Sequence, residues 1–362
     1  MQARLYRFIV LLAMAAGVSG CGDSGGTAGG SGEGLKRIVF LNNTNSPFWD
    51  ACRAGMVEAE KDFKLKDSNL TTVMEVNDGT PEVQIEKLRQ FGTQRDIVAV
   101  AISPIVADNP SIAQELKKLR DKGLHVICVD NDIAERFRDD SREFYIGTDN
   151  VKGGRQLGLC AKALLPEGGP YVQFVGKTGA QNARERMDGF KETVGDAFEE
   201  KARMADDGLA NKARASVRDA LTNFPDLKML VGIWSYNAPA IVDVVKEKNR
   251  DDLTVVTFDA EQLAVEYMDA GHIHAMVVQN PFDMGYQMVR LLKALHEDDE
   301  AIVKEMFPNH GDPGGDLYET GLKVVLPNEK SPVMKVEFDA GTEVLTLDQF
   351  KEWLAKYKLK SS

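Results

Sequence analysis

The sequence is poor in cysteine and in positive charge. Its 362 residues include four cysteines and five histidines, and 44 Lys and Arg stand against 56 Asp and Glu, for a net charge of −12 at pH 7. A chain this acidic does not bind nucleic acid or anionic lipid through bulk charge. The apolar run at residues 8–17 is too short to span a bilayer comfortably.

That short run has the pattern of an export signal. Arg4 and Arg7 precede it, and the small residues 18–20 lead from it to Cys21. The arrangement resembles a bacterial lipobox, in which the cysteine is diacylated and becomes the mature N-terminus. We therefore predict a signal peptide at residues 1–20, with an ordinary signal peptide and a coincidental cysteine as the alternative. In either case the folded part works outside the cytoplasm.

A glycine-rich segment follows the predicted lipidation site. Residues 21–34 combine glycine with Ser, Thr and acids, which predicts a flexible tether between the lipid and the folded part. The remaining cysteines are Cys52, Cys128 and Cys160, and three cysteines cannot form a disulfide framework. Because each lies in an apolar stretch, we expect buried thiols that act as small hydrophobic side chains.

From residue 35 onward, short β-branched runs alternate with longer amphipathic segments. The pattern predicts strands at 36–42, 71–76, 97–102, 125–129, 144–146, 171–175, 228–233, 254–258 and 275–278. It predicts helices at 48–62, 82–91, 112–122, 151–165, 183–194, 212–222, 238–248 and 262–270. Two successive sets of this kind indicate an α/β fold of two doubly wound parallel-sheet lobes, with ligand chemistry at the carboxyl ends of the strands.

The C-terminal tail departs from this alternation. Residues 310–316 form a turn-rich break, and Thr346 begins a capping box before a short helix. That helix carries the aromatic residues Phe350, Trp353 and Tyr357. Such a stripe can form a partner surface, but it more often packs on its own domain, and we expect it to do so here.

Polar and aromatic side chains gather directly after the predicted strands. These candidate ligand-binding residues are Asn42, Phe48, Trp49, Asp130, Asn131, Arg186, Trp234, Tyr236, Asp259 and Gln279. Carboxylates accept hydrogen bonds from vicinal hydroxyls, guanidinium and amide groups donate in return, and aromatic faces cover the C–H faces of a sugar ring. The set therefore indicates a neutral hydroxylated ligand, and pentoses, hexoses and polyols all fit it.

The order of several motifs resembles one family, the type I periplasmic sugar-binding proteins of the ribose-binding class that serve ABC importers. The resemblance covers residues 36–326 and is carried by the segments 45–49, 148–154, 183–190, 257–259 and 279–281. It implies a polypeptide that crosses between two lobes near residues 148, 279 and 320. The implied lobes are 35–147 with 280–320, and 148–279 with 321–362.

The resemblance also implies a role for each candidate residue. Phe48 and Trp49 would stack on the sugar ring, and Asn42 matches a position with a polar ligand contact. Asp130 and Asp259 would accept sugar hydroxyls from opposite lobes, while Arg186 and Gln279 would donate. Three ligand-facing positions differ from the ribose binders, because Asn131 stands in place of Arg and both Ser46 and Tyr236 in place of Asn. The second stacking aromatic that the resemblance implies for the second lobe has no clear match near residues 206–208, and Trp234 would take its role.

The expected protein is thus a lipid-anchored, monomeric substrate-binding protein of the cell envelope. It would capture a monosaccharide and deliver it to the membrane subunits of an ABC permease, without a cofactor, a metal or a nucleic acid. The alternative is an extracytoplasmic sugar sensor that reports ligand occupancy to a membrane kinase or chemoreceptor. A LacI-type regulator is rejected because the chain begins with an export signal and not with a basic helix-turn-helix. A hydrolase that uses Asp130 and Asp259 as its acid and base is the least favoured reading, and we expect no enzyme.

Overall fold

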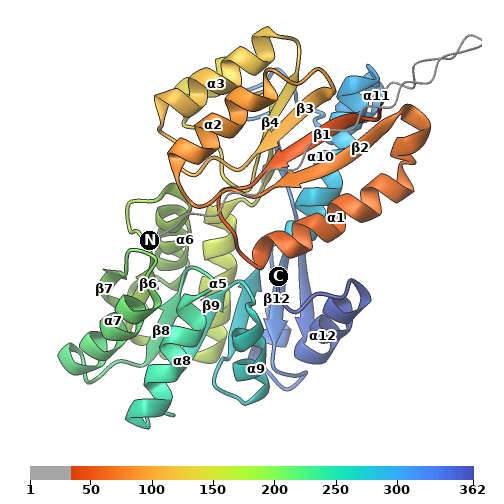
Figure 1. The fold of residues 1–362 in the computed structure, drawn as a ribbon. Helices are drawn as coiled ribbons and strands as arrows, with labels where there is room; N and C mark the ends of the chain where they lie inside the picture. Colours follow the sequence, from red (N-terminus) through yellow and green to blue (C-terminus); the bar gives the residue numbers. More distant parts are fainter. Residues whose placement is uncertain (1–33) are drawn as a thin grey trace, which may run out of the picture. The chain divides into compact units, whose positions relative to one another are not determined.

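The computed structural model describes residues 34–362 (Figure 1). The predicted signal peptide, Cys21 and all but the last residue of the tether lie outside the described residues. Within residues 34–362, no helix combines the length and the apolar character that a membrane crossing requires. Residues Leu35–Ser362 form a single unit by their contacts.

The first sheet has six strands in the order β11-β5-β4-β3-β1-β2, and all its pairs are parallel. In chain order these strands are β1 (Lys36–Leu41), β2 (Leu70–Glu75), β3 (Ile97–Ile102), β4 (His125–Val129), β5 (Phe144–Gly147) and β11 (Leu317–Glu319). The run IVAVAI of β3 is buried along most of its length, as expected for a strand covered on both faces.

Helices cover both faces of this sheet. Side chains from alternate strand positions pack on one face against α1 (Phe48–Asp62) and α10 (Pro281–His296), and on the other against α2 (Pro81–Phe91) and α3 (Pro110–Asp121). The smaller elements of this part are η1 (Leu65–Ser68), η2 (Glu135–Phe137), α4 (Arg138–Ser141) and α11 (Glu300–Met306).

The second sheet has seven strands in the order β13-β12-β10-β9-β8-β6-β7. In chain order they are β6 (Gly169–Val175), β7 (Phe198–Ala205), β8 (Met229–Gly232), β9 (Thr254–Phe258), β10 (Ala275–Val278), β12 (Leu322–Leu326) and β13 (Thr342–Thr346). One face packs against α5 (Asn150–Leu164) and α6 (Gln181–Val194). The other packs against α7 (Ala210–Asn223), α8 (Asn237–Lys248), α9 (Gln262–Asp269) and α12 (Leu347–Lys356). Short 3-10 turns lie at η3 (Gly195–Ala197) and η4 (Pro332–Lys335).

The polypeptide passes from one sheet to the other three times. The passages lie between β5 and α5, between β10 and α10, and between β11 and β12. Asp149 caps the start of α5 by accepting a hydrogen bond from the backbone nitrogen of Lys152 at 2.9 Å, and Asn280 caps α10 in the same way. Two of the passages therefore end in a fixed helix start. The assignment of the sheets to two separate lobes stays a prediction.

The two sheets are built alike at one helix crossing each. An added Cβ at Gly154 of α5 would overlap the carbonyl oxygen of Arg186 in α6, and one at Gly189 of α6 would overlap the carbonyl oxygen of Val151 in α5. In the first sheet, Gly55 of α1 stands in the same relation to the backbone of α10. Each pair of helices thus packs backbone against backbone through glycine.

The α/β architecture of two parallel-dominated sheets is as predicted, but the helices α10 and α11 and the strands β7, β11, β12 and β13 were not predicted. The strand β7 was not predicted, because its sequence FEEKARMA is largely charged, as an edge strand tolerates. The short strands β11 and β13 lie in the tail that we treated as irregular. The pair β10–β12 is antiparallel because β12 enters the second sheet directly from the first, without a crossover helix.

The aromatic helix of the tail contacts both parts of the fold. The capping box at Thr346 is present, and Phe350 is buried in the core of the second sheet. The ring of Tyr357 lies 4.1 Å from that of Phe282, which belongs to the first turn of α10, and the ring of Trp353 lies 6.2 Å from it. The helix therefore packs within its own chain, but it reaches beyond the second sheet.

Candidate functional site

Asp130 and Asp259 occupy equivalent places in the two sheets. Each directly follows the fourth strand of its set, β4 or β9, and each has a positive φ, of 67° and 60°. The backbone nitrogen of Asp130 donates to Ile146 in β5, and that of Asp259 donates to Val277 in β10. A left-handed conformation is unfavourable for a residue with a side chain, and such strain gathers at functional sites. The fold thus turns one carboxylate out of each sheet in the same way.

Arg186 is buried and held from several sides. Its Nε donates to Asn150 at 2.9 Å, and its Nη1 donates to the carbonyl oxygen of Ile233 at 3.2 Å. The guanidinium lies 3.7 Å from the carboxylate of Asp259 and 4.5 Å from the centre of the Phe258 ring. A cation fixed in this way is ready to donate to a ligand without reorganising.

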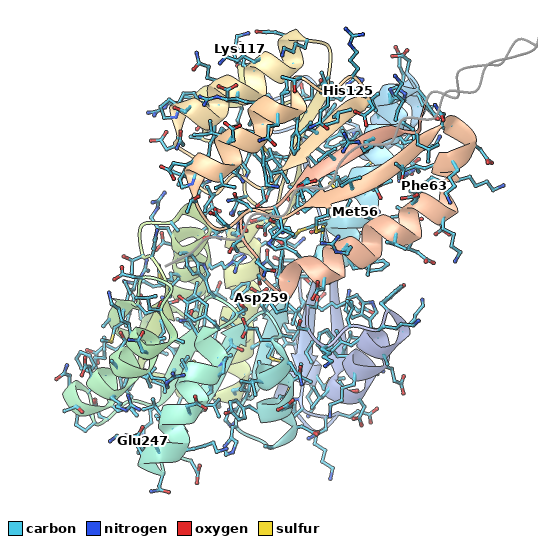
Figure 2. All side chains as sticks on the ribbon, viewed as in Figure 1. Met56, Phe63, Lys117, His125, Glu247 and Asp259 are labelled. Atoms are coloured by element: carbon cyan, nitrogen blue, oxygen red, sulfur yellow. The ribbon has the colours of Figure 1, made fainter. Side chains whose placement is uncertain are left out.

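Asp259, which is labelled in Figure 2, is also contacted by Gln279. The side-chain amide of Gln279 donates to one oxygen of Asp259 at 3.1 Å, and both residues are about 95% buried. Burial raises the pKa of the Asp259 carboxyl above its ordinary value, although Arg186 and Gln279 favour the charged form. The predicted residues Arg186, Asp259 and Gln279 therefore form one cluster.

The carboxyl group of Asp130 is influenced by the charges of Arg186 and Asp259. Its carboxylate accepts a long hydrogen bond of 3.3 Å from Ser103. Burial raises its pKa from 3.8 to about 7, the positive charge of Arg186 opposes this shift, and the negative charge of Asp259 adds to it. The charges of Arg186 and Asp259, which belong to the second sheet, thus act on a carboxyl group that follows a strand of the first, and a shared ligand site stays a prediction.

The raised pKa gives a pH dependence that can be measured. Below the ordinary carboxyl pKa the stabilising contribution of the protonated Asp130 is fully present, and it is lost as the pH rises through about 7, because the folded state resists ionisation. We expect wild type to lose free energy of unfolding relative to Asp130→Asn when the pH rises from about 5 to about 8. Urea titrations of both proteins at the two pH values measure this difference, and a difference independent of pH would contradict the expectation.

A chain of polar contacts links Asp130 to the aromatic pair of the first sheet. Trp49 donates from Nε1 to Asn43 at 3.2 Å, and Asn43 donates to Ser103, which in turn donates to Asp130. The Trp49 ring lies edge-on to Phe48, at 4.9 Å, and is 4% exposed. The stacking roles of Phe48 and Trp49 stay predictions.

The other predicted residues have less direct connections to this cluster. Asn42 is buried, and its side-chain oxygen accepts from the backbone of Asn77 at 2.8 Å, so that oxygen already holds the turn after β2. The backbone nitrogen of Asn131 donates to Val129. Trp234 directly follows Ile233, whose carbonyl oxygen binds Arg186, and Tyr236 lies two residues further on. Ligand contact by these four residues stays a prediction.

Four residues of this region were not among the sequence candidates. Ser103 directly follows β3, so the rule that found Asp130 also applies to it. Asn150 holds Arg186, Asp206 accepts from Tyr236, and Glu261 accepts from Ser235 at 2.7 Å. Asn150 lies within the segment 148–154 that carries the family resemblance, but nothing in the sequence pairs Asp206 with Tyr236.

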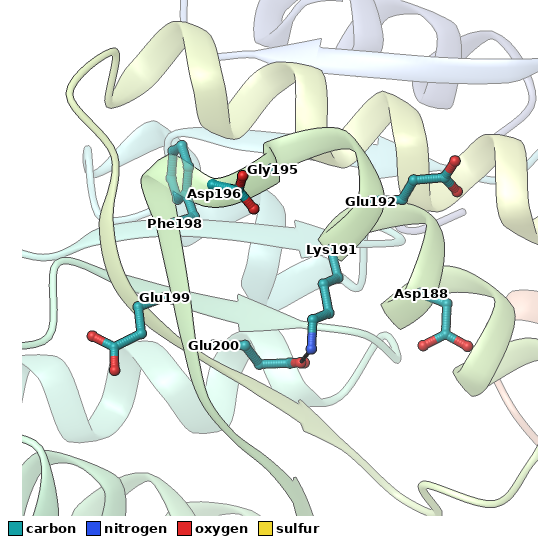
Figure 3. Close-up of a pocket in the computed structure, with 8 residues that line it drawn as sticks. All are labelled: Asp188, Lys191, Glu192, Gly195, Asp196, Phe198, Glu199 and Glu200. Carbon is teal, nitrogen blue, oxygen red and sulfur yellow. Dashed lines mark ion pairs between the residues drawn. The ribbon is translucent and has the colours of Figure 1, made fainter.

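A surface pocket lies elsewhere on the second sheet. It measures about 710 Å³ and is lined by residues of α6, η3 and β7, among them the ion pair of Lys191 and Glu200 at 2.8 Å (Figure 3). None of the candidate ligand-binding residues lines it. Within residues 34–362, no group of His, Cys, Asp and Glu side chains is placed to hold a metal ion.

Comparison with known protein families and with relatives of known function places this chain in a family. The chain belongs to the periplasmic binding protein domain family, which matches residues 38–300. It is 23% identical over 244 residues to the Ribose import binding protein RbsB of Bacillus subtilis (strain 168), which covers 67% of this chain and 75% of that protein. The resemblance to type I periplasmic sugar-binding proteins is therefore confirmed.

Solved structures share the fold. An ABC transporter solute binding protein from Burkholderia graminis C4D1M, in complex with D-arabinose, superposes with a TM-score of 0.69 at 21% identity and covers 85% of this chain and 99% of that one. The XylFII-LytSN complex gives a TM-score of 0.64 at 19% identity over 73% of this chain and 94% of that one. The predicted type I periplasmic binding protein fold is confirmed.

Proposed function

We propose that this protein captures a monosaccharide between two lobes and delivers it to an ABC importer. The lobes are built on the two sheets, 35–147 with 280–320 and 148–279 with 321–362. The observation that carries the proposal is the matched pair of Asp130 and Asp259, one from each sheet. The positive charge of Arg186 acts on both carboxyl groups. A ligand that contacts both carboxylates stabilises the closed arrangement of the lobes, and three connecting passages act as the hinge.

A monosaccharide suits the chemistry of the site. Its hydroxyls donate to carboxylates and accept from Arg186 and Gln279, and its C–H faces pack on aromatic rings. The named relatives include a ribose import binding protein and a protein solved with D-arabinose, which supports this class of ligand. The differences at Asn131 and Tyr236 argue against assigning ribose itself.

The test is a thermal-shift screen of the full chain in detergent against pentoses, hexoses, polyols and nucleosides. A ligand that binds only the native state raises the melting temperature. At a ligand concentration of 100 times its Kd, it adds about 2.7 kcal/mol to the free energy of unfolding. We expect at least one monosaccharide to give such a shift. If only nucleosides, amines or peptides shift the melting temperature, the proposed ligand class is wrong.

The membrane anchor is part of the proposal and has a separate test. Cys21 would carry the lipid, and the tether would let the folded part reach a permease. We expect the wild-type chain, expressed in a bacterium, to sediment with membranes and Cys21→Ser to appear in the soluble envelope fraction. Equal distribution of both proteins would leave sugar binding intact and refute the anchor.

A sensor of sugar occupancy is the second candidate. It is favoured by the structural likeness to XylFII, which was solved in a complex with LytSN. Both candidates need the same sugar site, so the screen does not separate them. Uptake of a radiolabelled sugar by cells with and without the gene does, because a sensor leaves the transport rate of a constitutively expressed permease unchanged.

A further inference from the structure

Asp206 is a buried carboxylate at the carboxyl ends of three neighbouring strands of the second sheet. It directly follows β7 and is 1% exposed. Its backbone nitrogen donates to Val175, the last residue of β6, at 3.1 Å. The residue is thus fixed to the sheet before its side chain makes any contact.

Both carboxylate oxygens of Asp206 hold the loop after β8. One accepts from the hydroxyl of Tyr236 and from the backbone of Gly208, and the other accepts from the side chain of Asn237 at 2.9 Å. Asn237 in turn accepts from the backbone nitrogen of Trp234 at 3.0 Å. Asp206 therefore fixes both ends of the segment 234–237, directly and through Asn237.

The two rings of this segment lie against the end of β6. An added Cβ at Gly176 would overlap the Trp234 ring and would come within 2.7 Å of the Tyr236 hydroxyl. The ring centres of Trp234 and Tyr236 are 6.4 Å apart in an edge-to-face arrangement. Gly176 thus makes the space in which the two rings form one aromatic wall, and we use this name for Trp234 and Tyr236 below.

The two polar atoms of the aromatic wall differ in their hydrogen bonding. The Tyr236 hydroxyl is committed to Asp206, and burial together with this bond raises its pKa. The Nε1 of Trp234 is buried and has no hydrogen-bond partner within residues 34–362. A buried donor without a partner is costly, and a ligand oxygen is a natural acceptor for it. The segment starts next to Ile233, whose carbonyl binds Arg186, so it borders the candidate site.

We propose that Asp206 is a positioning residue for ligand selection, which acts through the aromatic wall. By holding the Tyr236 hydroxyl, it makes that ring an apolar surface for a sugar C–H face and leaves the N–H of Trp234 as the donor to a ligand hydroxyl. This inference rests on the proposed function, and it adds that the selected ligand is a sugar with an oxygen opposite Trp234. An analogue without that oxygen leaves the buried N–H unpaired and is rejected.

The test measures affinity and selectivity by calorimetry on the full chain. The probes are D-ribose, D-glucose and D-galactose, each with its deoxy partner, 2-deoxy-D-ribose, 2-deoxy-D-glucose or D-fucose. Trp234→Phe keeps a ring and removes the N–H, and we expect a loss of affinity of about tenfold for the best-bound sugar and a smaller preference over one deoxy partner.

A double-mutant cycle shows whether Asp206 acts through Tyr236. We expect Asp206→Asn and Tyr236→Phe each to reduce the selectivity ratio, and the double variant to reduce it no further, because both remove the same contact. Asp207→Asn is the matched control, since this exposed neighbour pairs with Lys212, and it should keep wild-type affinity and selectivity.

Each outcome decides the proposal. A purely structural Asp206 would lower the melting temperature of its variant and leave the selectivity ratio unchanged, which overturns the inference and leaves the proposed function standing. Wild-type selectivity in Trp234→Phe also overturns it. If no sugar binds to wild type, the proposed function fails, and the inference fails with it.

Discussion

Asp259→Asn will lose most of the protein's affinity for its sugar. The carboxylate accepts from Gln279, faces Arg186 at 3.7 Å and is 5% exposed, so its charge has no solvent to replace it. Removing one partner of a buried charge pair costs about 3–5 kcal/mol, part of it because the other charge stays behind without a partner. If only about 3 kcal/mol of that appears in binding, the affinity falls by more than 100-fold.

Calorimetry with the best-bound sugar from the thermal-shift screen measures this loss. The melting temperature of the unliganded variant must be measured as well, because Arg186 loses its counter-charge in the free protein too. Asp252→Asn is the control: this exposed aspartate precedes the same strand at its other end, and its ion pair with Arg250 contributes little in solvent. If Asp259→Asn binds the sugar with wild-type affinity, the pair of Asp130 and Asp259 does not form the ligand-binding site.

The second large effect is expected from the single methyl group of Gly154→Ala. By helix propensity alone this change inside α5 should stabilise the protein by about 1 kcal/mol. The added Cβ, however, would overlap the carbonyl oxygen of Arg186, which is helix backbone and cannot rotate away. Overpacking of this kind costs about 1–3 kcal/mol, so we expect net destabilisation. Because the displaced backbone carries the Arg186 side chain, sugar affinity should fall as well.

Urea denaturation and calorimetry on the same sample test both parts of this expectation. Gly179→Ala is the control, because a Cβ at Gly179 meets nothing within 4 Å, and this variant should be as stable as wild type and bind equally well. A Gly154→Ala protein more stable than wild type would mean that α5 and α6 separate at little cost.

The sequence was most informative about polar residues that directly follow a buried strand. Asp130 and Asp259 were found as the first polar residues after buried runs, and their positive φ angles come from the same turn in each sheet. The strand β7 was missed for the opposite reason, since an edge strand needs no apolar alternation. Its charged sequence gives no strand pattern, and the strand is recognised only from its pairing with β6.

The arrangement of the site depended on contacts that no local pattern encodes. Arg186 was a candidate from its polar segment, but its hydrogen bonds to Asn150 and Ile233 join segments 36 and 47 residues away. The bond from Tyr236 to Asp206 spans 30 residues, which include α7 and β8. Such pairs follow from the order of strands in the sheet, and that order is a property of the whole chain.

The three passages between the sheets also affect how the chain is made. Thr320 donates to Gly147 across 173 residues, and Tyr286 of α10 donates to Asp62 across 224 residues. The first sheet therefore lacks an edge strand and a covering helix until most of the polypeptide has been synthesised. Long-range closure of this kind is slow, because the entropy of closing large loops must be overcome first. We expect a nascent chain with this topology to fold late, which would keep it unfolded during the export that its predicted signal peptide implies.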